Sequence, residues 1–185
     1  SVSCSHCPKG YAAGNESQSF CSVCKGGRYT DETARSSCTQ CPQGFMTSTF
    51  APQFCGACPP GQISESSSVT ECFTCPQGYI AEKSSMIKCD ACPDGWSSAK
   101  EKSTQCSLCK AGTACPLASI LPYSCPAGWI SPTAESNVCR PCASGFSQNQ
   151  KEQTSCITCN PGKFSAVESS VVCTSCSAGQ FAEVA

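Results

Sequence analysis

Ten pairs of cysteines, each with two residues between them, recur along the chain. Successive pairs begin 17 residues apart, with one interruption between Cys109 and Cys139. Thiols at this spacing can form disulfide bonds, bind zinc or carry out thiol–disulfide exchange. A short, strict period indicates that one small unit is copied in series. The pairs are Cys4/Cys7, Cys21/Cys24, Cys38/Cys41, Cys55/Cys58, Cys72/Cys75, Cys89/Cys92, Cys106/Cys109, Cys139/Cys142, Cys156/Cys159 and Cys173/Cys176.

The composition favours disulfide bonds in an oxidising compartment. Cysteine accounts for 22 of the 185 residues, about 12%, which exceeds the roughly 8–10% typical of disulfide scaffolds in short secreted chains. We therefore expect a secreted protein, extracellular or at a cell surface. Twelve Lys and Arg residues are interleaved with thirteen Asp and Glu residues, which argues against binding to nucleic acid or to an anionic membrane. Because apolar residues are scattered, covalent bridges must replace most of a common core.

Zinc and redox chemistry are the rival interpretations of the cysteines. Two successive pairs would suit a site of four thiolates. The pairs, however, follow one another without pause, Cys115 and Cys125 intrude, and no basic recognition face accompanies them. A redox motif needs a thioredoxin-like βαβ context, which the sequence lacks. The only histidine, His6, has no catalytic partner. We expect no metal, no cofactor and no enzyme activity.

A glycine stands three residues after the second cysteine of each pair and after Cys125. This fixed position indicates a turn that needs positive φ, or a close approach that a Cβ would block. Proline follows the cysteine directly in six units, where we expect it to fix φ at the first corner of the turn. The glycines are Gly10, Gly27, Gly44, Gly61, Gly78, Gly95, Gly112, Gly128, Gly145, Gly162 and Gly179, and the prolines are Pro8, Pro42, Pro59, Pro76, Pro93 and Pro126.

A large apolar side chain follows the glycine in every unit but that of Gly112. We expect it to pack over the neighbouring disulfide bonds as a minimal core; an aromatic ladder that stacks a ligand is the alternative. The other residues are polar or small and show no helical period. The predicted fold class is small disulfide-rich repeats, an elongated rod or solenoid of short β-hairpin-like loops with very little helix. The large residues are Tyr11, Tyr29, Phe45, Ile63, Tyr79, Trp96, Trp129, Phe146, Phe164 and Phe181.

Two disulfide schemes suit the regular repeats. In one, each pair closes on itself; in the other, the later cysteine of one pair bonds the earlier cysteine of the next pair, 14 residues on. Chain entropy favours the second scheme, because closing the longer loop stabilises the fold by roughly 3 kcal/mol and a bond between near neighbours by much less. The predicted bonds join Cys7 with Cys21, Cys24 with Cys38, Cys41 with Cys55, Cys58 with Cys72, Cys75 with Cys89 and Cys92 with Cys106.

The interruption bears on this choice. Pro122 stands where a first cysteine would fall and one residue is missing, yet Cys125 still lies 14 residues before Cys139. The stepping scheme requires this distance, whereas the self-closing scheme does not, although a bond of Cys115 with Cys125 would balance its count. The predicted bonds after the interruption join Cys125 with Cys139, Cys142 with Cys156 and Cys159 with Cys173.

Four cysteines remain after these assignments. Cys109 pairs with Cys115 by elimination, which leaves Cys4 and Cys176 unpaired within this fragment. We expect the partners of these two in further repeats of a longer array. The expected organisation is regular 17-residue repeats over 1–106, an irregular shortened repeat over 107–125 and regular repeats over 126–185.

Other sequence features concern the surface. Asn15 begins the sequon Asn-Glu-Ser in a predicted exposed loop and is the glycosylation candidate.

The uncharged stretch 111–134 contains four prolines, which argues against a membrane-spanning helix. Residues 116–123 are notably apolar; we expect them to fill the space left by the shortened repeat and to replace its missing large side chain. A lateral contact or a bend is the alternative interpretation of this segment.

The pattern Cys-Pro-x-Gly-[Tyr/Phe/Trp], the 14-residue loop and the closing Cys-x-x-Cys resemble the ephrin-receptor-like cysteine-rich repeat. This repeat is related to the first submodule of tumour-necrosis-factor-receptor domains. The resemblance covers essentially the whole chain and implies the same stepping of disulfide bonds. The segment from Cys109 to Cys125 resembles the shortened Cys-x5-Cys variant of such arrays. The chain lacks the alternating submodule of ligand-binding receptors in the tumour-necrosis-factor class, which argues against a cytokine-receptor role.

Long arrays of this repeat are typical of large extracellular proteins of protists and algae, including surface coats and flagellar hairs. The resemblance thus implies a structural extracellular protein that forms a stalk or the shaft of a cell-surface filament. A ligand-binding receptor ectodomain and a protective surface-antigen coat are the alternatives. The expected partners are further copies of the protein, other extracellular structural proteins or glycans, with no nucleic acid and no membrane insertion by this segment.

Overall fold

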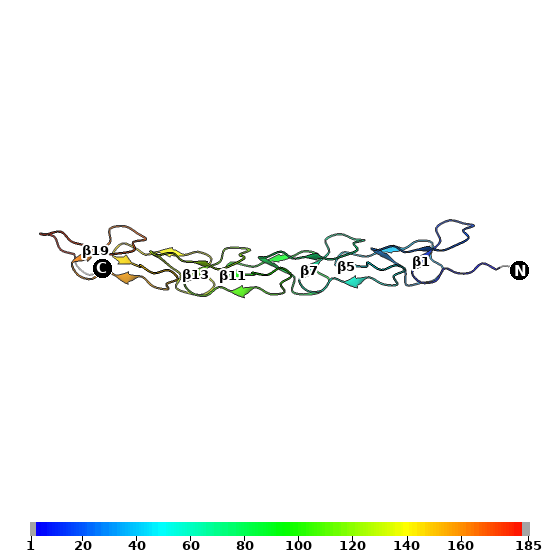
Figure 1. The fold of residues 1–185 in the computed structure, drawn as a ribbon, viewed down its shortest axis with the longest axis horizontal. Coiled ribbons are helices and arrows are strands. Elements are labelled where there is room, and N and C mark those ends of the chain that lie inside the picture. Colours follow the sequence, from blue (N-terminus) through cyan, green and yellow to red (C-terminus); the bar gives the residue numbers. More distant parts are fainter. Residues whose placement is uncertain (1–2, 183–185) are drawn as a thin grey trace. The chain divides into compact units, whose positions relative to one another are not determined.

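The computed structural model describes residues 3–182, and within them it contains short strands and no helix (Figure 1). Twenty strands of two residues form ten separate two-stranded sheets. The chain divides into two compact units. Unit 1 comprises the residues up to Asp90 together with Glu101–Gln105, and unit 2 comprises Ala91–Lys100 and the residues from Cys106 onward. Within each unit the hairpins follow one another in sequence order (Figure 1). These features confirm the predicted class of small disulfide-rich hairpin repeats.

The strands occupy the same two places in each repeat. The first strand of a hairpin directly follows the recurring glycine, and the second consists of the two residues between a pair of cysteines or their equivalents. The strands are β1 (Tyr11–Ala12), β2 (Ser22–Val23), β3 (Arg28–Tyr29), β4 (Thr39–Gln40), β5 (Phe45–Met46), β6 (Gly56–Ala57), β7 (Gln62–Ile63), β8 (Phe73–Thr74), β9 (Tyr79–Ile80), β10 (Asp90–Ala91), β11 (Trp96–Ser97), β12 (Ser107–Leu108), β13 (Thr113–Ala114), β14 (Tyr123–Ser124), β15 (Trp129–Ile130), β16 (Arg140–Pro141), β17 (Phe146–Ser147), β18 (Ile157–Thr158), β19 (Lys163–Phe164) and β20 (Thr174–Ser175).

Each repeat opens with a tight turn centred on the glycine. In the first turn the N–H of Tyr11 donates to the carbonyl of Pro8 at 3.1 Å, and Gly10 has a φ of 82°. A positive φ at the third of four residues is typical of a type II turn. The proline is therefore the first residue of the turn and accepts its hydrogen bond. Our expectation that it fixes the first corner is wrong, because that corner is Lys9.

The pairing of β1 with β2 explains why a cysteine pair does not close on itself. Tyr11 lies opposite Val23 in this antiparallel hairpin, and the N–H of Cys24 donates to the Gly10 carbonyl at 2.8 Å. The two residues between Cys21 and Cys24 are thus extended. Three extended steps separate two Cα atoms by about 10 Å, whereas a disulfide bond requires less than about 7 Å. The strand therefore directs the two cysteines to different partners.

Backbone hydrogen bonds join each repeat to the next one. In unit 1 the N–H of Gly27 donates to the Thr47 carbonyl at 2.7 Å, and the N–H of Thr47 donates to the Val69 carbonyl at 3.3 Å. The N–H of Ala51 donates back to the Cys24 carbonyl at 3.2 Å. Bonds with the same spacing recur in both units. Neighbouring repeats within a unit therefore stack as a solenoid, held by backbone bonds as well as by sulfur.

In every loop, one residue that is not a glycine adopts a left-handed conformation. Ser68 is an example: its N–H donates to the Cys41 carbonyl at 3.0 Å, and its carbonyl lies against Gly27, two repeats earlier. This conformation costs about 1–2 kcal/mol for an ordinary residue, so the surrounding contacts must hold it. The residues are Ser17, Ala34, Ala51, Ser68, Ser85, Lys102, Ala118, Glu135, Glu152 and Ser169.

The core consists of cysteines and small side chains. The large residues predicted to form it cover it instead: six of them are half-buried, three are exposed, and only Ile63 is buried. Ile63 packs with Cys75 and Ala81 in unit 1. Successive side chains of a strand point to opposite faces, so only one residue of each two-residue strand points inward. Most of the large residues stand on the outer face of the first strand, and the inner face carries smaller residues such as Ala12, Ser97 and Ala114.

Candidate functional site

The candidate site is the series of disulfide bonds that runs along the chain. Nine bonds join cysteines 14 residues apart, with Cα–Cα distances between 5.6 and 5.8 Å, as the stepping scheme requires. The tenth joins cysteines six residues apart, with a Cα–Cα distance of 6.4 Å. The bonds are Cys7 with Cys21, Cys24 with Cys38, Cys41 with Cys55, Cys58 with Cys72, Cys75 with Cys89, Cys92 with Cys106, Cys109 with Cys115, Cys125 with Cys139, Cys142 with Cys156 and Cys159 with Cys173.

The two cysteines of each regular bond differ in burial. The member that precedes the turn is buried in all ten bonds. Its partner is half-buried in the nine regular bonds, where it ends the polar loop, and buried in the case of Cys115. Cys4 is exposed and Cys176 is half-buried, and neither is bonded within the structure.

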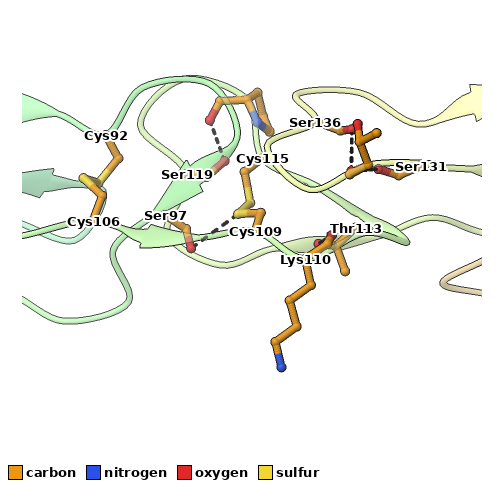
Figure 2. The surroundings of a disulfide bond; sticks show 12 residues. Cys92, Ser97, Cys106, Cys109, Lys110, Thr113, Cys115, Ser119, Ser131 and Ser136 are labelled. Atoms are coloured by element: carbon orange, nitrogen blue, oxygen red, sulfur yellow. Dashed lines mark hydrogen bonds between the residues drawn. A yellow bond between two sulfur atoms is a disulfide. The ribbon is translucent and has the colours of Figure 1, made fainter. Parts of the chain in front are cut away.

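Figure 2 shows how the shortened repeat replaces its missing bridge. Cys115 stands six residues after the buried cysteine, a place that Thr30 and Ser98 hold in regular repeats. Its carbonyl accepts the Gly95 N–H at 2.7 Å, as the Thr30 carbonyl accepts that of Gly10 at 2.9 Å. Cys115 therefore occupies an ordinary buried position of the repeat, at which the residue is a cysteine in place of a small polar residue. Because this place lies next to the buried cysteine, a bond to Cys109 forms without moving the backbone.

Sequence reasoning missed the importance of this sixth position. Its side chains are small in almost every repeat, and this pattern was the available signal. Buried serines here bond the carbonyl two residues on: Ser64 Oγ donates to Ser66 at 2.7 Å, and Ser131 Oγ donates to Thr133 at 3.1 Å. Each of these buried hydroxyls thus has a hydrogen-bond partner. The equivalent residues are Ala13, Thr30, Thr47, Ser64, Ala81, Ser98, Cys115, Ser131, Gln148, Ser165 and Ala182.

A serine hydroxyl also approaches the short disulfide bond. Ser97 Oγ lies 3.7 Å from Cys109 Sγ (Figure 2). A disulfide sulfur carries no hydrogen, so the hydroxyl is the donor. This weak bond satisfies the buried Ser97, which belongs to the inner face of β11.

The shortened repeat keeps the hairpin and loses a residue from the loop. β13 pairs with β14, and Tyr123 and Ser124 take the place of the residues between two cysteines. Ala118, the left-handed residue, follows Cys115 by three positions, whereas Lys102 follows Ser98 by four. The deletion therefore lies just before the left-handed residue. The turn and the second strand remain in register.

The apolar segment 116–123 does not fill a space in the core. The side chains of Leu117, Leu121 and Tyr123 are 67%, 65% and 58% exposed. The expectation that the segment replaces a missing core residue is therefore wrong, because the small residues of the repeat already fill the interior. Tyr123 instead lines an apolar groove of about 450 Å³ together with Pro116, Pro126, Trp129 and Val138.

The remaining candidates lie on the surface. Asn15 is exposed in the loop between β1 and β2, and His6 is exposed beside Cys7. Among residues 3–182 no three His, Cys, Asp or Glu side chains gather as a metal site. No helix in this described part of the chain could cross a membrane. Neither a protein-family model nor a curated protein matches the chain.

Proposed function

We propose that the protein is structural and extracellular, and that its disulfide-linked repeats form a stalk or the shaft of a cell-surface filament. The observation that carries this proposal is the covalent path along the chain. From Cys7 onward each regular bond is followed by a strand of two residues and then by the next bond. Each 14-residue loop is bypassed by a sulfur bridge. A chain built in this way transmits tension through covalent bonds at every regular step.

The geometry sets the length of this path. In a regular repeat, a bridge contributes a Cα–Cα distance of 5.7 Å, and three extended steps contribute about 10 Å. A repeat under tension therefore spans about 16 Å, although its 17 residues could reach about 60 Å without the bridge. The difference is loop that bears no load. The disulfide bonds, and not the noncovalent packing, thus set the maximum extension of a regular repeat.

The surface and the compartment are compatible with this role. Disulfide bonds at this density indicate an oxidising environment, which supports a location outside the cell. The polar loops that bear no load carry the sequon at Asn15, so sugars attached there would not interrupt the covalent path. The same exposed loops would serve a receptor ectodomain or a surface coat, so the location of the native material separates these functions.

Imaging of the native material tests the proposal. An antibody raised against the oxidised chain should label extracellular fibres or stalks at regular intervals, and mild reduction should lengthen or fragment the labelled structures. Label on isolated molecules in the plasma membrane, or on a uniform coat, would overturn the filament function. A preparation from which the chain has been depleted provides the matched control for the antibody.

A further inference from the structure

Two stretches of the chain carry no charged residue at all. Residues 36–64 belong to unit 1 and residues 111–134 to unit 2. All twelve Lys and Arg residues and all thirteen Asp and Glu residues lie outside these two stretches. Elsewhere charges of both signs are interleaved along the repeats. Since interface centres are depleted of charge and rich in aromatic residues, the two neutral stretches are the surfaces to consider.

The neutral stretch of unit 2 presents the apolar groove. Tyr123 and Trp129 form part of its wall, and Val138, at its rim, is 58% exposed. The side-chain amide of Asn137, which also lines the groove, already donates to Asp94 Oδ2 at 3.0 Å. The groove therefore offers apolar and aromatic surface, with this polar group already engaged. Such a site suits an apolar or aromatic occupant.

The neutral stretch of unit 1 presents two phenylalanines. Phe50 and Phe54 lie in the loop between β5 and β6 and are 81% and 74% exposed. Both follow an uncharged strand, and the nearest charges along the sequence are Arg35 and Glu65. Aromatic rings that protrude from a loop held by a disulfide bond lose little conformational freedom when they are buried. They have the character of interface anchors.

We propose that the Phe50 and Phe54 loop of one copy docks into the Tyr123 and Trp129 groove of a second copy. The inference rests on the proposed filament function and adds a lateral partner to it. The residues that line the groove and the residues of the phenylalanine loop are uncharged, so the contact buries no charged lining residue. Both surfaces are present on the same chain. The contact joins two different surfaces. Such heterologous contacts, unless they close a ring, continue from copy to copy and generate fibres.

The size of the contact predicts its strength. Two phenylalanines bury about 150–250 Å² each, which is less than the roughly 800 Å² that each partner contributes to a standard stable interface. A single contact should therefore be weak. Many copies aligned along a fibre would hold together through multivalency, in which each contact raises the effective concentration of the next.

Sedimentation of oxidised, folded chains tests the proposal. The reference chain carries Cys4→Ser and Cys176→Ser, so that the unpaired thiols cannot link copies. Two variants are made in this background: Phe50→Ser with Phe54→Ser removes the loop anchors, and Tyr123→Ser with Val138→Ser removes the groove. The control is Phe20→Ser, because Phe20 is 67% exposed at the repeat position of Phe54 but lies outside both neutral stretches.

The expected result is a specific pattern of assembly. The reference chain and the Phe20→Ser control should associate progressively with concentration, and each double variant alone should associate at least tenfold more weakly. A mixture of the two double variants should form a one-to-one complex and nothing larger, because one intact loop meets one intact groove. This complementation also shows that both variants fold.

Other outcomes overturn the proposal. A reference chain that remains monomeric at high micromolar concentration excludes the second copy as the occupant. Association that persists in the loop variant, or a mixture that stays monomeric, places the contact elsewhere. None of these results affects the covalent path, so the filament function can survive the loss of this lateral contact and is tested separately by imaging.

Discussion

The regular repeats and the shortened repeat share a backbone but differ in their covalent path. Both have the glycine turn, the two-stranded hairpin and the left-handed loop residue. In a regular repeat the load leaves a bridge and crosses three residue steps before the next bridge. In the shortened repeat it leaves the bridge at Cys115 and must cross ten steps to Cys125. The backbone pattern therefore does not depend on which residue closes the bridge.

This difference makes the shortened repeat the most extensible part of the path. Ten steps can extend to about 35 Å, compared with about 10 Å for a regular cysteine pair. The chain thus combines stiff covalent segments with one segment that is secured by backbone hydrogen bonds and packing.

Pulling a single oxidised chain by its ends should give the largest difference. The shortened repeat should yield first, with a gain of a few tens of ångströms, since the regular repeats are held taut by sulfur. Adding a reductant should then release about 43 Å for each regular bridge and about 15 Å for the bridge of Cys109 with Cys115, as estimated from the loop lengths and the Cα–Cα distances. Force spectroscopy measures these steps. Steps of a single size would contradict the assigned bonds.

Alanine at the turn glycine should destabilise both kinds of repeat equally. A Cβ on Gly27 would clash with the Ser68 carbonyl, and one on Gly112 with that of Glu152, at positive φ in both cases. We expect Gly27→Ala and Gly112→Ala each to lower the free energy of unfolding by about 3 kcal/mol. Gly162→Ala is the matched control, with a similar φ and no neighbour within 4 Å among residues 3–182, so about 1 kcal/mol is expected. Denaturant unfolding of the oxidised variants measures the three values.

Removal of a whole disulfide bond should destabilise a regular repeat only slightly more than the shortened repeat. The chain-entropy relation gives about 3 kcal/mol for the Cys92→Ser and Cys106→Ser pair and about 2.4 kcal/mol for the Cys109→Ser and Cys115→Ser pair. Serine at position 115 also restores the residue type of regular repeats. Thermal unfolding of the two double variants tests this order. A much larger loss from the short bridge would show that it supports more than its own loop.

Loss of one buried hydroxyl should have the smallest effect. Ser131→Ala removes the donor to the Thr133 carbonyl, with an expected cost of about 1 kcal/mol. Thr113→Ala in the shortened repeat removes an exposed bond to the Lys110 carbonyl and should cost less than about 0.5 kcal/mol. Chemical denaturation compares the two variants, and an equal cost would contradict the special role of the sixth position.

The sequence predicted the features that depend on one repeat and its immediate neighbour. The 14-residue spacing identified the bridges because chain entropy favours closing the longer loop and because the spacing persists from Cys125 to Cys139 across the interruption. The invariant glycine identified the turn, and both reasons considered for it hold at Gly27.

Features that depend on stacking could not be predicted from the repeat pattern. The left-handed residue is Ser, Ala, Lys or Glu instead of glycine, so no local signal marks it. Its conformation is held by contacts with the two preceding repeats, as those of Ser68 with Cys41 and Gly27 illustrate. The inner face of the strands was also predicted wrongly. The large residues were expected to form the core, but small residues fill the interior. The wrong expectation for residues 116–123 had the same cause: small side chains already fill the interior, so the segment had no space to fill.

The contact between Gly27 and Ser68 has a consequence for biosynthesis. For the secreted protein proposed above, the N-terminus enters the secretory route first. Ser68 follows Gly27 by 41 residues, whereas the bridge that begins at Cys24 needs only 14. Covalent closure can therefore precede full packing, and the last two repeats to emerge are always incompletely covered. Oxidising enzymes can therefore reach the most recently emerged thiols during this delay. Along the nascent chain, each repeat is expected to form its disulfide bond before later repeats pack against it.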